Sequence, residues 1–84
     1  MNRRAGWIWS DTRVLRELMR DTIRAWRRPR TAADAFGAVT EAFGRVGERR
    51  LWRALRWLIQ RGEVIAIGRR HTGSTYAWGQ RCAR

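Results

Sequence analysis

The chain has 84 residues and a mass of 9.9 kDa, so we expect one domain, without a second core or a catalytic cleft between lobes. Its residues are 44% hydrophobic and 11% aromatic, which supports a packed core and excludes a disordered basic tail. Nineteen basic residues, all of them arginine, stand against seven acidic ones and give a formal net charge of +12. Such a charge attracts polyanions over about 8 Å in physiological salt, so nucleic acid is the first partner to consider.

The sequence has no feature of an exported or membrane protein. Its single cysteine, Cys82, cannot form an intramolecular disulfide, so we expect a reducing compartment. No apolar run approaches the roughly 20 residues that span a bilayer, and residues 1–10 are too short and too rich in tryptophan for a secretory signal. We therefore expect a soluble cytoplasmic protein without a membrane partner, associated with the nucleoid if it binds DNA.

No residues are spaced for catalysis. Ser10, Ser74 and the threonines lack the histidine and acid partners of a nucleophilic site, and there is no glycine-rich phosphate loop. His71 is a lone imidazole, which we interpret as a solvated loop residue and not as a metal ligand. We expect no catalytic residue, no metal, no cofactor and no enzymatic activity.

The first helix is predicted to follow a basic, tryptophan-rich arm at residues 1–9, in which Trp7-Ile8-Trp9 is either a short strand or an anchor. Ser10 is a suitable N-cap, and Pro29 is expected to end the helix because proline disfavours helical geometry in the residue before it. Apolar residues recur on one face, at Val14, Leu15, Leu18, Met19, Ile23 and Trp26. Arginines occupy the other, at Arg13, Arg16, Arg20, Arg24 and Arg27. Because Glu17 and Asp21 are within pairing distance of them, we interpret this face as solvated, with a second phosphate-binding face as the alternative.

Two further helices are predicted in the middle of the chain. Thr31 and Asp34 have the spacing of a capping box, and an apolar face follows at Ala35, Phe36, Val39, Ala42 and Phe43. After a turn at residues 44–47, a third helix is predicted at about residues 48–61, from Glu48 to the stop signal of Gly62. Its apolar stripe is Leu51, Ala54, Leu55, Leu58 and Ile59.

The last part of the chain changes to a strand pattern. Residues 64–67 and 75–78 are short, apolar and rich in β-branched or aromatic residues, and a polar segment with a glycine separates them. These features predict a β-hairpin. The fold class is therefore α+β, with three helices followed by a two-stranded hairpin in a domain of residues 10–79, and with a basic tail at residues 80–84.

This order of elements resembles the winged helix-turn-helix family, as does the run LWRALRWLIQRGEV at residues 51–64, where that family often has an R-A-L-x-x-L-x-x-x-G-x-V pattern. The resemblance covers about residues 10–79 and implies fold more directly than function. It implies a small DNA-binding protein, a transcriptional regulator, with the third helix in the major groove and the wing at residues 68–75 on the DNA backbone. The positions that match the family's DNA contacts are Thr31 at a helix N-terminus, Arg49, Arg50, Trp52 and Arg53 on the third helix, and Arg69 and Arg70 at the wing tip.

The helical period supports the same face without the family. Arg49, Arg53, Arg56 and Gln60 fall together, opposite the leucines of the stripe. A helix of about 10 to 12 Å diameter fits the roughly 12 Å major groove, and arginine is well suited to guanine O6 and N7. Residues 45–84 carry ten arginines and two acidic residues, the largest surplus of charge in the chain.

The tryptophans leave other functions open. Trp26 and Trp78 are expected in the core or at its edge, whereas Trp52 and Trp57 either frame the core, stack on nucleic acid or anchor a protein partner. The alternative function is a winged-helix interaction module, an adaptor or inhibitor, that docks its Arg/Trp face on an acidic protein. A third alternative is single-stranded RNA. We expect a monomer or a weak homodimer, formed through the first helix or the N-terminal tryptophans.

Overall fold

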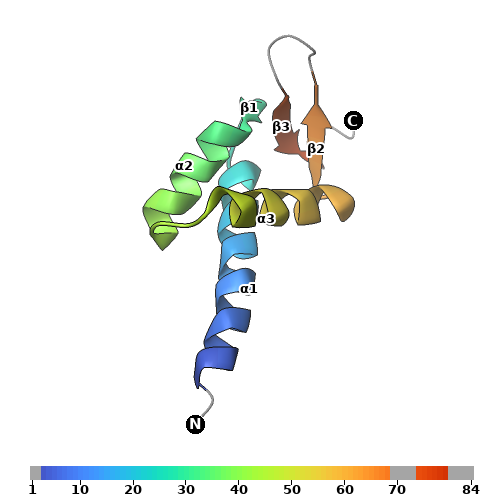
Figure 1. The fold of residues 1–84 in the computed structure, drawn as a ribbon. Helices are drawn as coiled ribbons and strands as arrows, with labels where there is room; N and C mark the ends of the chain where they lie inside the picture. Colours follow the sequence, from blue (N-terminus) through green and yellow to red (C-terminus); the bar gives the residue numbers. More distant parts are fainter. Residues whose placement is uncertain (1–2, 69–73, 80–84) are drawn as a thin grey trace.

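The computed structural model describes residues 3–68 and 74–79, with side chains from residue 11 onward. Its elements are α1 (Arg3–Arg24), β1 (Arg30–Thr31), α2 (Ala32–Phe43), α3 (Glu48–Gln60), β2 (Val64–Ile67) and β3 (Thr75–Trp78). α3 crosses α1, α2 lies to one side, and the sheet lies toward the C-terminal end of α1 (Figure 1). The predicted α+β class is confirmed, and the arrangement is consistent with a winged helix.

α1 begins and ends earlier than predicted. It starts at Arg3, so the predicted N-cap Ser10 lies inside the helix, and residues 3–9 of the predicted arm continue it. The predicted start was wrong because a capping side chain is only a local preference. No proline lies before Ser10 to stop the helix from extending back through residues 3–9. The helix ends at Arg24, where a backbone bond from Trp26 N–H to the carbonyl of residue 23 tightens the last turn and brings Trp26 against the core. Although α1 has 22 residues, neither it nor any other described helix is both long and apolar enough to cross a membrane.

α2 and α3 form where they were predicted. Thr31 caps α2, since its Oγ1 accepts a hydrogen bond from the backbone N–H of Asp34 at 3.3 Å. α2 ends before Gly44, which has a φ of +110° that favours glycine. α3 begins at Glu48, and Gly62, with a φ of +81°, follows its end as expected of a C-terminal glycine.

The sheet has three antiparallel strands in the order β1-β3-β2, one strand more than the predicted hairpin (Figure 1). β2 and β3 pair with Val64 opposite Trp78, as a hairpin requires. β1 is only Arg30–Thr31, which lie opposite Tyr76 and Thr75 of β3. Two residues are too few to show a strand period, and their partners are more than forty positions away, so the two-stranded prediction was incomplete.

The core lies where the three helices meet the sheet. It consists of Leu15, Met19, Ile23, Ala35, Val39, Leu51, Ala54, Leu55, Leu58, Val64 and Tyr76. The predicted apolar faces supply most of these side chains, and full burial of each large aliphatic one stabilises the fold by about 1.5 to 3 kcal/mol. Val14 and Ala42 are exceptions, because both are exposed. Trp26 and Trp78 pack at the edge of the core, as predicted.

An ionic cluster of Arg20, Arg61 and Glu63 ties α1 to the turn between α3 and β2. Arg20 donates from Nε and Nη2 to the two Glu63 carboxylate oxygens at 2.6 and 3.0 Å, and Arg61 Nε donates to Oε2 at 2.8 Å. The Arg20 and Glu63 side chains are only 23% and 21% exposed. The hydrogen bonds from Arg20, and then from Arg61, lower the pKa of Glu63 below its usual value. Glu17, a partner of Arg20 predicted from the sequence, approaches its Nη1 at 3.7 Å and is 56% exposed.

We predict that Glu63→Gln destabilises the protein by about 1 to 3 kcal/mol near neutral pH, because Arg20 loses its charged partner. Since the native pKa of Glu63 is lowered, its contribution is fully present above the usual glutamate pKa of about 4.3 and is lost as the pH falls through the lower native value. Urea unfolding at a series of pH values measures this, and the two proteins should converge in stability on acidification. Glu17→Gln, the same change at the exposed partner of Arg20, should cost less than about 0.5 kcal/mol. Equal losses for the two variants would contradict the assigned role of Glu63.

A second prediction concerns two glycines that have equal space around them. An added Cβ meets no atom within 4 Å at Gly37, inside α2, or at Gly44, but only Gly44 has a positive φ. Gly37→Ala should stabilise the protein by about 0.5 to 1 kcal/mol, because alanine is the better helix residue. Gly44→Ala should destabilise it by about 1 kcal/mol or more through backbone strain. Thermal unfolding of both variants checks the opposite signs.

Candidate nucleic-acid interface

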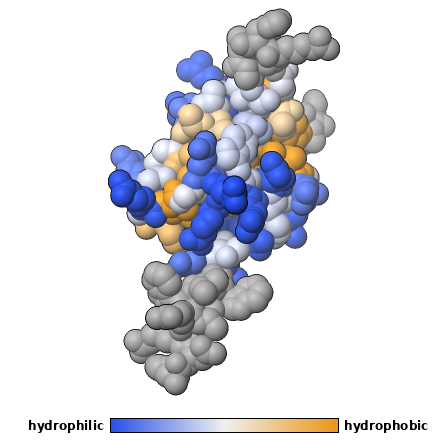
Figure 2. All heavy atoms as spheres, viewed as in Figure 1, coloured by the Kyte–Doolittle hydropathy of each residue, from blue (hydrophilic) through white to orange (hydrophobic). Residues whose placement is uncertain are grey.

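The outward face of α3 is basic. Arg49, Arg53, Arg56 and Gln60 are all exposed, while the leucines on the opposite side of the helix are buried. Figure 2 shows hydrophilic residues gathered across the middle of this side of the molecule, where α3 runs in Figure 1, with hydrophobic patches on either side. The predicted division of α3 into an apolar stripe and an arginine face is therefore confirmed.

The arginines of this face have no counterions in the described part of the chain. None of Arg49, Arg50, Arg53 and Arg56 forms an ion pair there. Glu63 is taken up by Arg20 and Arg61, on the side of the domain that joins α1 to the sheet. The outward face of α3 therefore keeps its positive charge, which attracts polyanions.

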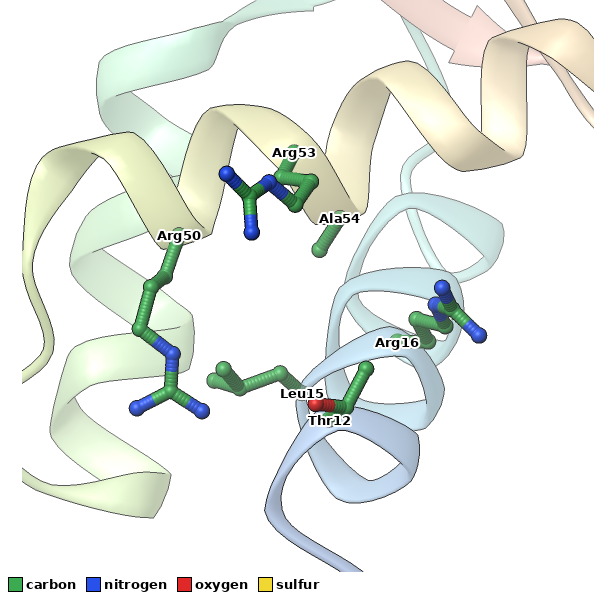
Figure 3. A pocket seen from close by; sticks show the side chains of 6 residues that line it. All are labelled: Thr12, Leu15, Arg16, Arg50, Arg53 and Ala54. Atoms are coloured by element: carbon green, nitrogen blue, oxygen red, sulfur yellow. The ribbon is translucent and has the colours of Figure 1, made fainter. Parts of the chain in front are cut away.

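Arg50 and Arg53 line a pocket together with a third arginine that the sequence did not associate with them. Both line a pocket of about 190 Å³ between α1 and α3, together with Arg16 and Thr12 of α1. In Figure 3, Arg50 and Arg53 extend from α3, and Arg16 lies across the gap on α1. No pattern within one helix reveals this pairing, because it depends on how α1 and α3 cross.

Trp57 is held by arginines at the edge of the core. The guanidinium carbon of Arg16 lies 4.3 Å from its ring centroid and that of Arg61 lies 4.7 Å away, both within the range of a cation–π contact. The ring is half-buried and packs against the core. Of the roles left open for Trp57, the structure supports framing the core. The prediction that Arg16 and Arg20 belong to a merely solvated face was incomplete, since both also approach this ring.

Trp52 connects α3 to α2, whereas Trp57 lies on the side of α3 that contacts α1. Its ring meets Phe36 edge to face, with centroids 5.0 Å apart and an interplanar angle of 89°. It remains 36% exposed and lies beside an apolar groove of about 450 Å³, which Ala32 and Ala33 of α2 also line. Trp52 thus has a structural role, and part of its ring is still accessible.

Of the remaining residues predicted to contact DNA, the structure describes Thr31 but not Arg69 and Arg70. Thr31 is exposed at the N-terminus of α2, and its two successors line the groove beside Trp52, so this helix end is next to the first turns of α3. Arg69 and Arg70, the predicted wing tip, lie outside the described residues, as do His71 and Cys82. In the part of the chain that is described, no three His, Cys, Asp or Glu side chains converge as metal ligands do.

No protein-family model matches this chain, and a search of the curated proteins finds none similar to it. The function of the arginine face is therefore inferred from its own geometry and charge.

Proposed function

We propose that this protein binds double-stranded DNA as a winged helix-turn-helix protein, with α3 in the major groove, and that it acts as a small transcriptional regulator. The observation that supports this function best is the row of exposed arginines on α3 without acidic partners in the described chain. A single helix fits the groove, and the arginine fork matches the two acceptors of guanine. The order of elements, with β1 between α1 and α2 and the β2–β3 pair after α3, is consistent with that fold.

The arginines of α3 have different parts in this proposal. Arg49 and Arg56 are exposed on the side of α3 opposite the buried leucines, so we assign them to base edges. Arg53 also lines the pocket between α1 and α3, which places it at the margin of the face. We assign Arg69 and Arg70 of the wing, and the α2 N-terminus at Thr31, to the DNA backbone, as the resemblance implies.

The alternative of a protein-interaction module has less support. It needs exposed tryptophans as anchors, because such residues dominate interface energetics. Trp57 is half-buried under Arg16 and Arg61, and Trp52 is partly shielded by Phe36. Single-stranded RNA needs the same free aromatic faces for stacking. We therefore propose duplex DNA as the partner.

The proposal predicts a steep dependence of DNA binding on salt. Affinity for a random-sequence duplex, measured from about 50 to 300 mM salt, should give a slope of log K against log salt equal to about −0.9 for each phosphate neutralised, and several phosphates are expected. Single-stranded RNA of equal length serves as the competitor. A shallow slope with binding lost at physiological salt, or a clear preference for RNA, would contradict the proposal.

A further prediction separates base reading from general attraction. On a preferred duplex selected from a random library, Arg56→Ala should weaken binding by about 1 to 3 kcal/mol and relax the preference at one position. Arg13→Ala removes the same charge from an exposed position on α1 and should weaken binding to all sequences slightly and alike. The contrary result is that Arg56→Ala loses the same affinity on the selected duplex as on a random one, as Arg13→Ala does. In that case the protein binds DNA without reading bases through Arg56.

A further inference from the structure

We propose that the pocket between α1 and α3 holds one phosphate of the DNA backbone, so that α1 is part of the DNA interface. This inference rests on the proposed function and adds to it a contact on a helix outside the helix-turn-helix. The pocket has a volume of about 190 Å³, and three of its six lining residues are arginines: Arg16 from α1, and Arg50 and Arg53 from α3.

The charge of the pocket favours an anion. No acidic residue lines it, and within the described residues none of Arg16, Arg50 and Arg53 forms an ion pair. Arginines of two helices therefore line one pocket, and no carboxylate of the described chain neutralises them there, so its positive charge favours an anion. A phosphate oxyanion accepts strong, charge-assisted hydrogen bonds from guanidinium groups.

Arg16 is held in place for such a contact. Its guanidinium lies 4.3 Å from the Trp57 ring centroid. A cation–π contact uses the flat face of the guanidinium and leaves the N–H groups at its edge available to oxygen atoms. Because the ring limits the freedom of the side chain, less entropy is lost when a phosphate binds than with a freely moving arginine.

The position of the pocket favours the DNA backbone over a free anion as the source of the phosphate. Arg53 belongs both to the outward face of α3 and to the pocket, so the two surfaces are continuous (Figure 3). A duplex that presents its major groove to Arg49 and Arg56 has its phosphate backbone at the margins of the helix. α1 crosses α3, and its residue Arg16 lines the pocket at the margin where Arg50 and Arg53 lie.

The test compares two charge-neutralising substitutions on the same helix. Arg16→Gln removes the pocket arginine, and Arg13→Gln removes an exposed arginine that does not line the pocket. On a random-sequence duplex, Arg16→Gln should weaken binding about tenfold and make the salt slope shallower by about 0.9, the loss of one phosphate contact. Arg13→Gln should change affinity less than about twofold and leave the slope unchanged.

Arg16→Met is the second variant, because methionine removes the charge and keeps an apolar contact with Trp57. It should reproduce the loss seen with Arg16→Gln while its thermal unfolding remains close to that of the wild type. If wild type, Arg16→Met and Arg13→Gln all have the same salt slope, the pocket does not hold a backbone phosphate, and the proposed function stands without it. If the wild type does not bind duplex DNA, both proposals fail.

Inorganic phosphate provides the last arm of the experiment. Titration into the wild-type protein, followed by NMR at the arginine Nε–H groups, reports whether the pocket takes up a free anion. Binding of phosphate together with an unchanged DNA slope in Arg16→Met would assign the pocket to a small anion and overturn the backbone proposal. A reduced slope in Arg16→Met, with or without phosphate binding, supports it.

Discussion

The crossing of α1 over α3 is the contact on which the rest of this domain depends. Its centre is apolar, because both helices contribute buried side chains to the same core. Its margin is ionic and aromatic, because Arg16 and Arg61 lie against Trp57 and Arg20 is bound to Glu63. At this margin Trp57 is the partner of Arg16 and Arg61, and Glu63 is the partner of Arg20 and Arg61. The turn that carries Glu63 leads directly into the sheet.

The same contact explains how the charge is distributed over the molecule. Seven acidic residues cannot neutralise nineteen arginines, so the positions of the acids decide which surfaces stay positive. Glu63 pairs with Arg20, whose side chain is partly buried and whose unpaired charge would be costly. The outward face of α3 and the pocket beside α1 are left without carboxylates in the described chain. Uncompensated like charge does not stabilise a fold, and a protein that retains it at one surface is expected to use it there for binding.

The tryptophans help a short chain to form a core and to position its arginines. A small domain buries a limited fraction of its surface, and a buried tryptophan contributes about 150 to 250 Å² to the buried area. Trp26 and Trp78 extend the edge of the core, and Trp52 links α3 to α2 through Phe36. Trp57 adds a flat surface against which the guanidinium group of Arg16 lies, and no carboxylate of the described chain pairs with Arg16. An ordered and still charged arginine is suited to a phosphate, which connects the packing of the domain to its proposed function.

The sequence by itself determined the elements whose signals are local. The Thr31 cap, the bounds of α2 and α3, the leucine stripe and the outward arginines all follow from residues within a few positions of one another, and the structure confirms them. Tertiary structure alone decided three features. These are the pairing of Arg20 with Glu63, 43 positions apart, the two-residue strand β1, and the pocket that Arg16 lines together with Arg50 and Arg53. These contacts depend on how separate elements cross, and a helical or strand period carries no information about a partner on another element. The start of α1 was also misjudged, because one favourable capping residue does not outweigh neighbours that continue the helix.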